Sequence, residues 1–265
     1  MRLRSRARRG GFRHMPFRKA IVREPGEGFR RCISTHPMRH TVDVARAKVQ
    51  HATYVKTLED LGLEVLRLEK ADGLPDSCFV EDTAVVRGGR ALLCRPSEEA
   101  RRDEVTAIEP VLSEMLAAKR ASEPATIEGG DVLHLRDRLV CGLTRRTNRE
   151  GARQMADWLG VKVDVVVAPA MMHLKSHASY IRDGTILVTK ALAGEPAFAN
   201  EDRLVVPDGE EYAANVLSVN GAVVMPAGFP GTKELLERAG VAVIALEMTE
   251  FPKCDGAMTC LSILL

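Results

Sequence analysis

The feature that most constrains the fold of this 265-residue chain is an internal repeat. A pattern of helical period covers residues 42–61, ends at Gly62 and leads into an alternating strand over residues 63–69. The same order recurs at 146–159, Gly160 and 161–167, and again at 232–239, Gly240 and 241–246. A glycine at the end of each helix favours a left-handed cap that turns the chain into the strand.

A second element alternates with the first. Short apolar pairs separated by a Gly, Asp or Arg turn predict β-hairpins over residues 84–94, 132–143, 180–188 and 217–225, with a last strand at 261–265. A further helix is predicted over residues 98–119, with a less clear strand after it. The chain therefore holds about five α/β units, and a period of this size indicates modules arranged around an axis or stacked in a row.

Polar residues stand at the corner before each hairpin. The corners are 79–82 (FVED), 127–131 (IEGGD), 173–176 (HLKS), 214–215 (AN) and 255–260 (DGAMTC). If the units surround one axis, equivalent corners converge on one pocket. Acids, a histidine and a cysteine that are far apart in the sequence then meet there.

Cys260 and His173 form the first candidate pair. A cysteine nucleophile needs a thiolate and a partner that handles protons, and histidine is the side chain whose pKa lies near neutrality. Taken alone, such a cysteine is more often a packing residue and such a histidine a hydrogen-bonded structural group. Their place at equivalent corners of the repeat favours the catalytic interpretation.

Carboxylates at two corners indicate the charge of the ligand. Glu128 and Asp131 flank two glycines that allow close backbone approach, although for Asp131 we expect a turn or capping role. Asp76, Glu81 and Asp82 add negative charge at the first corner. Several carboxylates in one pocket bind a cation, and a planar guanidinium pairs with two of them in fork geometry.

Two arginines, Arg101 and Arg146, stand at the starts of helices that follow hairpins. From there either can reach a substrate carboxylate, although ordinary helix-surface charge explains both equally well. The histidines show no metal-ligand spacing, so no metal or cofactor is predicted.

The composition argues against a secreted or membrane protein. With 45% hydrophobic residues the chain can fill a sizeable core, and no run approaches the roughly 18 apolar residues of a membrane span. The six cysteines are scattered without a C-x-x-C pair. We therefore expect free thiols and a cytoplasmic location, with neither a disulfide framework nor a zinc site.

The first nineteen residues carry eight Lys or Arg residues and no acid, although the net charge of the whole chain is only +2. Such an arm can bind nucleic acid or an acidic membrane surface, or resemble a transit peptide. Because it lacks apolar periodicity, we expect a disordered tail over residues 1–15 and a single catalytic domain over residues 16–265. Neither nucleic acid nor a membrane is predicted as a partner, and a homo-oligomer is left open.

From about Phe17 onward, seven ordered motifs resemble one family, the dimethylarginine dimethylaminohydrolases, which are guanidino-group-modifying enzymes. The motifs are 42–46 (VDVAR), 75–82 (PDSCFVED), 100–105 (ARRDEV), 128–133 (EGGDVL), 146–148 (RTN), 173–176 (HLKS) and 255–260 (DGAMTC). The resemblance implies a five-bladed α/β-propeller, the pentein fold. It also implies hydrolysis of N-omega-methylated arginines to citrulline and dimethylamine or methylamine, with a small guanidino amino acid as the partner.

The same resemblance implies roles for site residues. Cys260 is expected to be the nucleophile, His173 the general acid and base, and Glu128 the carboxylate that orients both the guanidinium and His173. The implied substrate-binding residues are Asp82 with Glu81 beside it for the guanidinium, Arg101 and Arg146 for the α-carboxylate, Asp76 and the main chain at Cys254 for the α-amino group, and Phe79 along the substrate stem. The reaction is expected to pass through a thiouronium-type covalent intermediate without a cofactor.

Residues 25–40, where the family carries a lid, match its pattern poorly, so Ile33 is only a candidate lid residue. Cys254 is either a second reactive thiol or, since the family uses the main chain there, an incidental side chain. Three other functions stay open: an arginine deiminase or amidinotransferase, although those chains are usually longer; a non-catalytic arginine-binding protein; and nucleic-acid binding through the basic arm.

Overall fold

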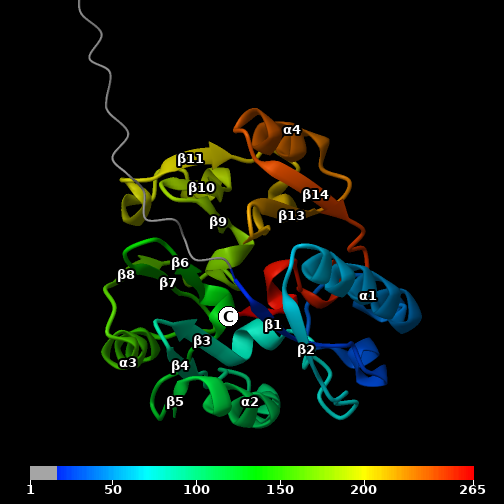
Figure 1. Ribbon diagram of the computed structural model, residues 1–265, viewed down its shortest axis with the longest axis vertical. Coiled ribbons are helices and arrows are strands. Elements are labelled where there is room, and N and C mark those ends of the chain that lie inside the picture. Colours follow the sequence, from blue (N-terminus) through cyan, green and yellow to red (C-terminus); the bar gives the residue numbers. More distant parts are fainter. Residues whose placement is uncertain (1–16) are drawn as a thin grey trace, which may run out of the picture.

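In the computed structural model, which describes residues 17–265, the chain forms five three-stranded sheets around a common centre (Figure 1). The strands are β1 (Lys19–Arg23), β2 (Glu64–Leu68), β3 (Ala84–Arg87), β4 (Arg90–Leu93), β5 (Ala117–Arg120), β6 (Val132–His134), β7 (Leu139–Leu143), β8 (Val163–Val167), β9 (Ala178–Arg182), β10 (Thr185–Val188), β11 (Asp202–Val205), β12 (Leu217–Val219), β13 (Ala222–Pro226), β14 (Ala242–Leu246) and β15 (Ile263–Leu264). Neighbouring strands within the sheets are β15-β1-β2, β3-β4-β5, β6-β7-β8, β11-β10-β9 and β12-β13-β14. The predicted five-bladed α/β-propeller is confirmed.

All five sheets follow one rule of connection. Two strands pair antiparallel, and a third strand, reached after a crossover, pairs parallel to the middle one, as β3, β4 and β5 show. In the first sheet the antiparallel pair joins the two ends of the described chain, because Ala20 of β1 lies opposite Leu264 of β15. This pairing closes the ring of sheets and brings the residues just before β15 to its centre.

Residues 17–265 form four α-helices at the periphery of the ring (Figure 1): α1 (Val44–Asp60), α2 (Ile108–Met115), α3 (Arg149–Leu159) and α4 (Pro230–Arg238). The side chain of Asn148 caps α3 by accepting a hydrogen bond from the backbone N–H of Gly151. Gly160, which follows α3, has a φ of 63°, the left-handed conformation predicted for it. The crossover between β10 and β11 contains only the short 3₁₀ turns Lys190–Leu192 and Pro196–Phe198.

The helix predicted over residues 98–119 is only partly right. The chain forms a 3₁₀ helix at Glu99–Ala107, continues as α2 and turns at Leu116 into β5. Pro110 lies in the first turn of α2, where its missing N–H has no helical partner to lose, so it favours an α-helix that starts here. The last strand is also shorter than predicted, because the 3₁₀ turn Thr259–Leu261 occupies its beginning.

An aromatic cluster in the core joins segments far apart in sequence. Phe29 packs against Phe79 and Phe251, with ring centroids 5.8 and 5.6 Å away, respectively. Such tilted and edge-on aromatic pairs stabilise packing beyond the apolar area that they bury. The cluster holds the segment before α1 against the chain that leads into the first and fifth corners.

Within residues 17–265, no helix combines the length and the apolar character needed to cross a membrane. The predicted basic tail, residues 1–15, lies outside the described residues. Its disorder and the domain boundary at residue 16 stay predictions.

Candidate active site

Five short 3₁₀ turns form the corners predicted from the sequence, one before each of β3, β6, β9, β12 and β15. Within residues 17–265 they are Val80–Thr83, Gly129–Asp131, Leu174–Ser176, Glu211–Ala214 and Thr259–Leu261. The first corner contacts the second and the fifth, and the third contacts the second and the fourth. Hydrogen bonds between Asn215, which follows the fourth corner, and Thr259 of the fifth complete a connected ring of corners at the centre of the propeller, which confirms that they converge.

Two glycines let the second corner approach its neighbours. A Cβ atom on Gly129 would lie 2.0 Å from the carbonyl oxygen of Glu81, and one on Gly130 would lie 2.7 Å from Nδ1 of His173. The N–H of Gly130 donates a 2.9 Å hydrogen bond to Oδ1 of Asp82. Any side chain at these two positions would push the corners apart. The glycines are therefore required for the close approach of the first, second and third corners.

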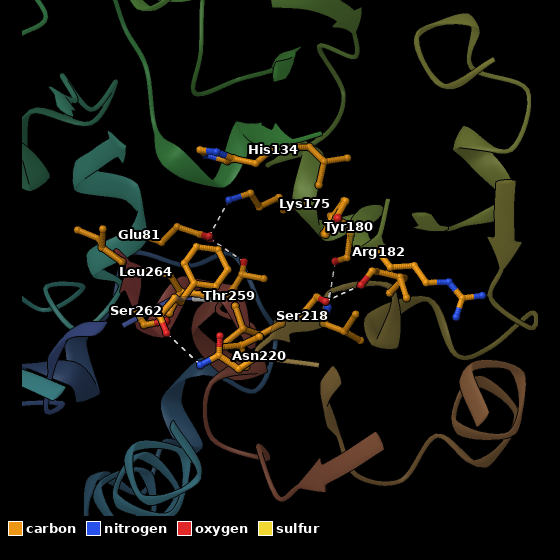
Figure 2. A pocket seen from close by; sticks show the side chains of 18 of the residues that line it. Glu81, His134, Lys175, Tyr180, Arg182, Ser218, Asn220, Thr259, Ser262 and Leu264 are labelled. Atoms are coloured by element: carbon orange, nitrogen blue, oxygen red, sulfur yellow. Dashed lines mark hydrogen bonds and ion pairs between the residues drawn. The ribbon is translucent and has the colours of Figure 1, made fainter. Parts of the chain in front are cut away.

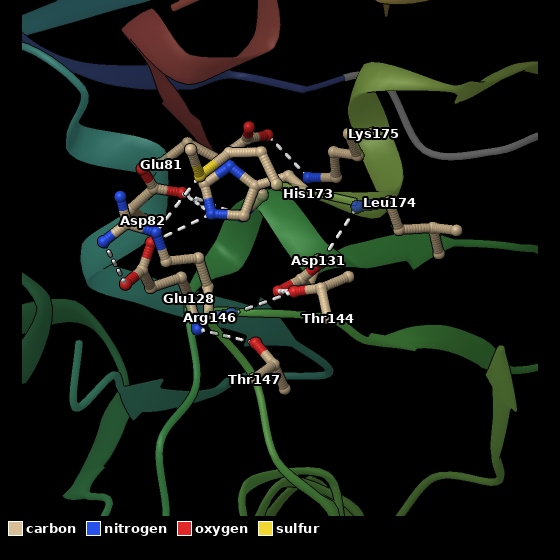
Figure 3. A network of polar contacts seen from close by, with 12 residues as sticks. Glu81, Asp82, Glu128, Asp131, Thr144, Arg146, Thr147, His173, Leu174 and Lys175 are labelled. Carbon is tan, nitrogen blue, oxygen red and sulfur yellow. Dashed lines mark hydrogen bonds and ion pairs between the residues drawn. The ribbon is translucent and has the colours of Figure 1, made fainter. Parts of the chain in front are cut away.

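His173 and Glu128 form a buried pair (Figure 3). Nε2 of His173 lies 2.9 Å from Oε2 of Glu128 and 3.8 Å from Oδ1 of Asp82. Burial alone would lower the pKa of His173, but the charge of Asp82 and the hydrogen bond with Glu128 raise it to about 9. The imidazole therefore holds its second proton at neutral pH, which is the state that a general acid needs.

Arg101 lies among the acids of the site. Its Nη2 donates to Oε2 of Glu104 at 2.9 Å, its Nε also donates to Glu104, and its Nη1 donates to Oδ2 of Asp82 at 3.0 Å. Oε2 of Glu128 is 3.5 Å from Nη1, and Oδ2 of Asp76 is 3.8 Å from Nε. One guanidinium thus partly balances the charge of four carboxylates, and both of its edges are already occupied.

Sequence reasoning missed Glu104. Its carboxylate is 1% exposed, and burial raises its pKa to about 7 against the opposing effect of Arg101. The two residues stand three apart in the 3₁₀ helix Glu99–Ala107, where side chains at this spacing lie one above the other. The signal that could have revealed the pair is its opposite charge at this spacing.

Most of the predicted site residues line one small cavity of about 20 Å³. Its lining is Ile33, Asp76, Phe79, Asp82, Arg101, Arg146, Met172, His173, Cys254, Asp255, Gly256 and Cys260. Such a volume holds about one water molecule, so a ligand the size of an amino acid enters only after part of the wall moves. Ile33, whose N–H donates to Asp76 at 3.1 Å, lies in the segment where the lid was expected.

Cys260 is buried at this cavity, within the 3₁₀ turn Thr259–Leu261. Burial raises the pKa of its thiol, and the negative charges of Asp82 and Glu81 add to this effect. The unliganded protein therefore holds a neutral thiol at neutral pH. A cation bound beside the acids acts in the opposite direction and favours the thiolate.

Arg146 brings a buried donor to the cavity wall. Its Nε donates to the sulfur of Met172 at 3.2 Å, whereas its Nη1 has no hydrogen-bond partner within residues 17–265. Nη1 lies 3.2 Å from Oε1 of Glu98 but without the geometry of a hydrogen bond. Because a buried guanidinium N–H without an acceptor costs free energy, Arg146 is suited to receive a carboxylate.

Asp76 offers the opposite charge in the same cavity. Its oxygens accept from the N–H of Ile33 at 3.1 and 3.3 Å, and burial raises its pKa to about 6 against the effect of Arg101. Together, Arg146 and Asp76 supply complementary groups for the two charged ends of an α-amino acid.

Glu81 turns away from this cavity, although its neighbour Asp82 lines it. The Glu81 carboxylate accepts hydrogen bonds of 2.6 Å from both Nζ of Lys175 and Oγ1 of Thr259. It lines a second cavity of about 490 Å³ (Figure 2). Its position therefore does not support the guanidinium-binding role that the resemblance implies for it.

Asp131 has the structural environment expected from the sequence. Its Oδ1 accepts from the N–H of Leu174 at 2.9 Å and its Oδ2 accepts from the hydroxyl of Thr144 at 2.7 Å (Figure 3). The bond with Leu174 ties the second corner to the third.

A metal ion has one candidate set of ligands within residues 17–265. One ligand atom each from Asp82, Glu128 and His173 lies within 4.8 Å of the other two. Arg101 already contacts both carboxylates, and His173 donates a hydrogen bond to Glu128. Cationic side chains of the protein therefore balance the negative charge of Asp82 and Glu128. That the protein needs no cofactor stays a prediction.

The expectation of free thiols is wrong for one pair. Cys32 and Cys254 form a disulfide with their Cα atoms 5.7 Å apart, whereas Cys78, Cys94, Cys141 and Cys260 are free. The two partners are 222 residues apart, so no local spacing indicates the bond. Since Ile33 and Cys254 both line the cavity, the disulfide joins two parts of its wall, and Cys254 is not a second reactive thiol in this state.

We expect four titratable thiols per chain in denatured, unreduced protein and six after reduction, because all six cysteines lie in the described part. Reduction should lower the free energy of unfolding by up to about 5 kcal/mol, since the bond closes a very long loop. Thiol titration in denaturant and urea unfolding with and without reductant measure the two effects. A Cys32→Ser/Cys254→Ser double variant should be insensitive to reductant, and six thiols before reduction would contradict the assignment.

Comparison with known proteins agrees with this site. A family model described as arginine deiminase matches residues 70–204. The chain is 35% identical to N(G),N(G)-dimethylarginine dimethylaminohydrolase of Pseudomonas aeruginosa over 226 residues, 83% of this chain and 89% of that protein. It is 36% identical to the protein of that name from Streptomyces coelicolor over 254 residues, 94% and 97% of the two chains.

A solved structure extends the similarity to the whole fold. The Pseudomonas aeruginosa enzyme, as a Cys-to-Ser variant complexed with citrulline, matches with a TM-score of 0.92 and 32% identity over 95% of this chain and 100% of that one. The five sheets and the converging corners define the arginine deiminase class of guanidino-modifying proteins. Within that class, the chain belongs to the N(G),N(G)-dimethylarginine dimethylaminohydrolase family.

Proposed function

We propose that this protein hydrolyses N-omega-methylated arginines, asymmetric dimethylarginine and monomethylarginine, to citrulline with release of dimethylamine or methylamine. The observation that carries the proposal is that Cys260, Asp82 and His173 line one small cavity, while Glu128, which does not line it, is hydrogen-bonded to His173. Family membership supports it, as does the citrulline complex of the Pseudomonas aeruginosa relative. The second cavity, although larger, is lined by Glu81, His134 and Lys175 but by no cysteine of the described residues.

The chemistry begins with the substrate cation. A guanidinium placed against Asp82 offsets the negative charge of Asp82, which, together with burial, raises the pKa of Cys260. The Cys260 thiol passes its proton to solvent, the thiolate then attacks the guanidinium carbon, and a C–S bond forms. The C–N bond to the methylated nitrogen breaks while His173 gives that nitrogen a proton, and dimethylamine leaves.

The second half of the reaction restores the enzyme. His173, now neutral, removes a proton from water, and the resulting hydroxide adds to the carbon of the S-alkylthiouronium intermediate. The C–S bond then breaks, which releases citrulline and regenerates the thiol. Because Glu128 and Asp82 favour the protonated imidazole, they return His173 to its starting state.

The remaining contacts determine which molecule fits. In this proposal Arg146 binds the α-carboxylate, Asp76 and the main chain at Cys254 bind the α-amino group, and Phe79 packs along the aliphatic stem. Arg101 was expected to share the carboxylate, but its donors are occupied by Glu104 and Asp82. We therefore assign Arg101 to holding the acids in place and leave the carboxylate to Arg146.

We test the proposal by incubating the protein separately with asymmetric dimethylarginine, monomethylarginine, arginine and agmatine and measuring the ureido product. The methylated substrates should exceed arginine in kcat/KM by about tenfold or more, which a closed site can achieve with about 1.4 kcal/mol of discrimination. Agmatine, which lacks the carboxylate assigned to Arg146, should have a KM at least about tenfold above that of arginine.

A preference for arginine in this assay would replace the proposal with a deiminase of the same mechanism, the one rival that the family model favours. No product from any of the compounds, with folded protein, would refute both. A cytoplasmic location and a homo-oligomer stay predictions. The disulfide of Cys32 and Cys254 counts against the first of these, because such bonds are rare in a reducing cytosol.

A further inference from the structure

The fourth corner of the ring supplies no group to the chemistry, yet it holds the segment that leads to Cys260. Asn215 is 3% exposed, and its Oδ1 accepts a 2.9 Å hydrogen bond from the N–H of Thr259. Its Nδ2 donates to Oγ1 of Thr259 at 3.2 Å and to the carbonyl of Lys175 at 3.1 Å. Nearby, the hydroxyl of Tyr212 donates to the carbonyl of Gly256 at 3.0 Å.

Thr259 is held on its other side by the first corner. Its hydroxyl donates to Oε2 of Glu81 at 2.6 Å, and Oε1 of the same carboxylate accepts from Nζ of Lys175 (Figure 2). Asn215, Thr259, Glu81 and Lys175 therefore close a polar network between the first, third, fourth and fifth corners. Each bond in a buried network of this kind limits the freedom of the others.

Cys260 follows Thr259 directly in a 3₁₀ turn of only three residues. With the N–H and the hydroxyl of Thr259 both bound, the Cα of Cys260 has little room to shift relative to the first and fourth corners. Nucleophilic attack requires the reacting atoms to meet at about 3–3.5 Å, and a displacement of 1 Å can cost about 100-fold in rate.

We propose that Asn215 is a positioning residue for the reaction and that it acts through the hydroxyl and N–H of Thr259 to hold Cys260 at the cavity. The inference rests on the proposed function, because it takes Cys260 as the nucleophile. The proposal assigns a role to the fourth corner, which contributes no residue to the reaction itself. It also explains why Glu81 faces away from the cavity although Asp82 lines it.

The test compares Thr259→Val, which keeps the shape of the side chain, with Thr259→Ser, which keeps the hydroxyl, and with Asn215→Ala. Thr259→Val and Asn215→Ala should lower kcat for asymmetric dimethylarginine by about 10- to 100-fold with KM within about threefold, whereas Thr259→Ser should stay within about threefold in both. Thr232→Val is the matched control: it removes a buried hydroxyl that donates to Glu210 at 2.7 Å in α4, away from the cavity.

A second measurement needs no turnover. Iodoacetamide alkylation of Cys260, located by peptide mass, should be at least about fivefold faster in Thr259→Val and Asn215→Ala, because the loosened turn exposes a residue that is only 7% exposed in the intact protein. Wild-type kcat and alkylation rates in both variants, with a loss of stability like that of Thr232→Val, would show a purely structural network. Equal damage in Thr259→Ser would also overturn the proposal. If the wild type turns over none of the guanidino substrates, the alkylation rates alone decide.

Discussion

Cys260→Ser is expected to lower kcat for asymmetric dimethylarginine by about four orders of magnitude or more, as loss of a nucleophile does in other covalent hydrolases. A serine hydroxyl needs a general base to become nucleophilic. His173 cannot be that base at neutral pH, because its pKa of about 9 keeps the imidazole protonated. The thiol alone can lose its proton in response to the bound cation, so oxygen cannot replace sulfur here.

The measurement is citrulline release under single-turnover conditions, together with calorimetric titration of citrulline to show that the variant still binds. Cys141→Ala is the matched control, since Cys141 is a fully buried thiol in β7 that does not line the cavity. Its kcat should stay within about threefold of the wild type if the variant folds. A Cys260→Ser protein that retained a tenth of the wild-type kcat would show that Cys260 is not the nucleophile.

The arrangement of the corners could be predicted because it depends on local patterns. A helix that ends at glycine and continues into a strand indicates the crossover, and a polar residue before each hairpin marks the start of the next blade. Glu128 and His173 were predicted in this way, and the structure places them 2.9 Å apart although they are 45 residues apart in sequence. The two glycines after Glu128 were a further local signal, since close backbone approach explains both.

The direction in which a side chain points inside a turn could not be predicted. Glu81 and Asp82 are adjacent carboxylates, and the sequence offers no reason to separate them. In the 3₁₀ turn Val80–Thr83 they project to different sides, so Asp82 meets Arg101 and Glu81 meets Lys175. Successive side chains in a helical turn diverge by at least about 100°, and two of them rarely reach one small cavity.

Partners that the repeat does not specify were the other gap. Arg101 was predicted to bind a substrate carboxylate, but its donors are bound by Glu104, three residues further along the 3₁₀ helix Glu99–Ala107, and by Asp82 of the first corner. The Cys32–Cys254 bond joins segments that no repeat relates to one another. Both depend on backbone geometry that periodicity in the sequence does not specify.

Glu128→Gln should lower kcat by about 10²- to 10⁴-fold, the range typical of general acid–base groups, because it removes the carboxylate partner of His173. Glu201→Gln is the matched control: Glu201 accepts a 3.0 Å hydrogen bond from Arg138 in a mostly buried pair and does not line the cavity. A Glu128→Gln enzyme with wild-type kcat would contradict the assigned role.

The pH profile tests this role of Glu128. In the unliganded wild type His173 loses its proton near pH 9, so the alkaline limb of kcat/KM, which reports the free enzyme, should lie near that pH. Without the hydrogen bond and charge of Glu128, only Asp82 and Asp131 oppose the lowering of the His173 pKa by burial. The alkaline limb should therefore move down by about one pH unit or more.

The free energy of unfolding depends on the same proton. Because the pKa of His173 is raised in the folded state, its contribution to stability is fully present below about pH 6.5 and is lost as the pH rises through 9. Urea unfolding of both proteins between pH 6 and 10 should therefore show a smaller loss for Glu128→Gln, and an unchanged alkaline limb would mean that Glu128 does not hold the proton on His173.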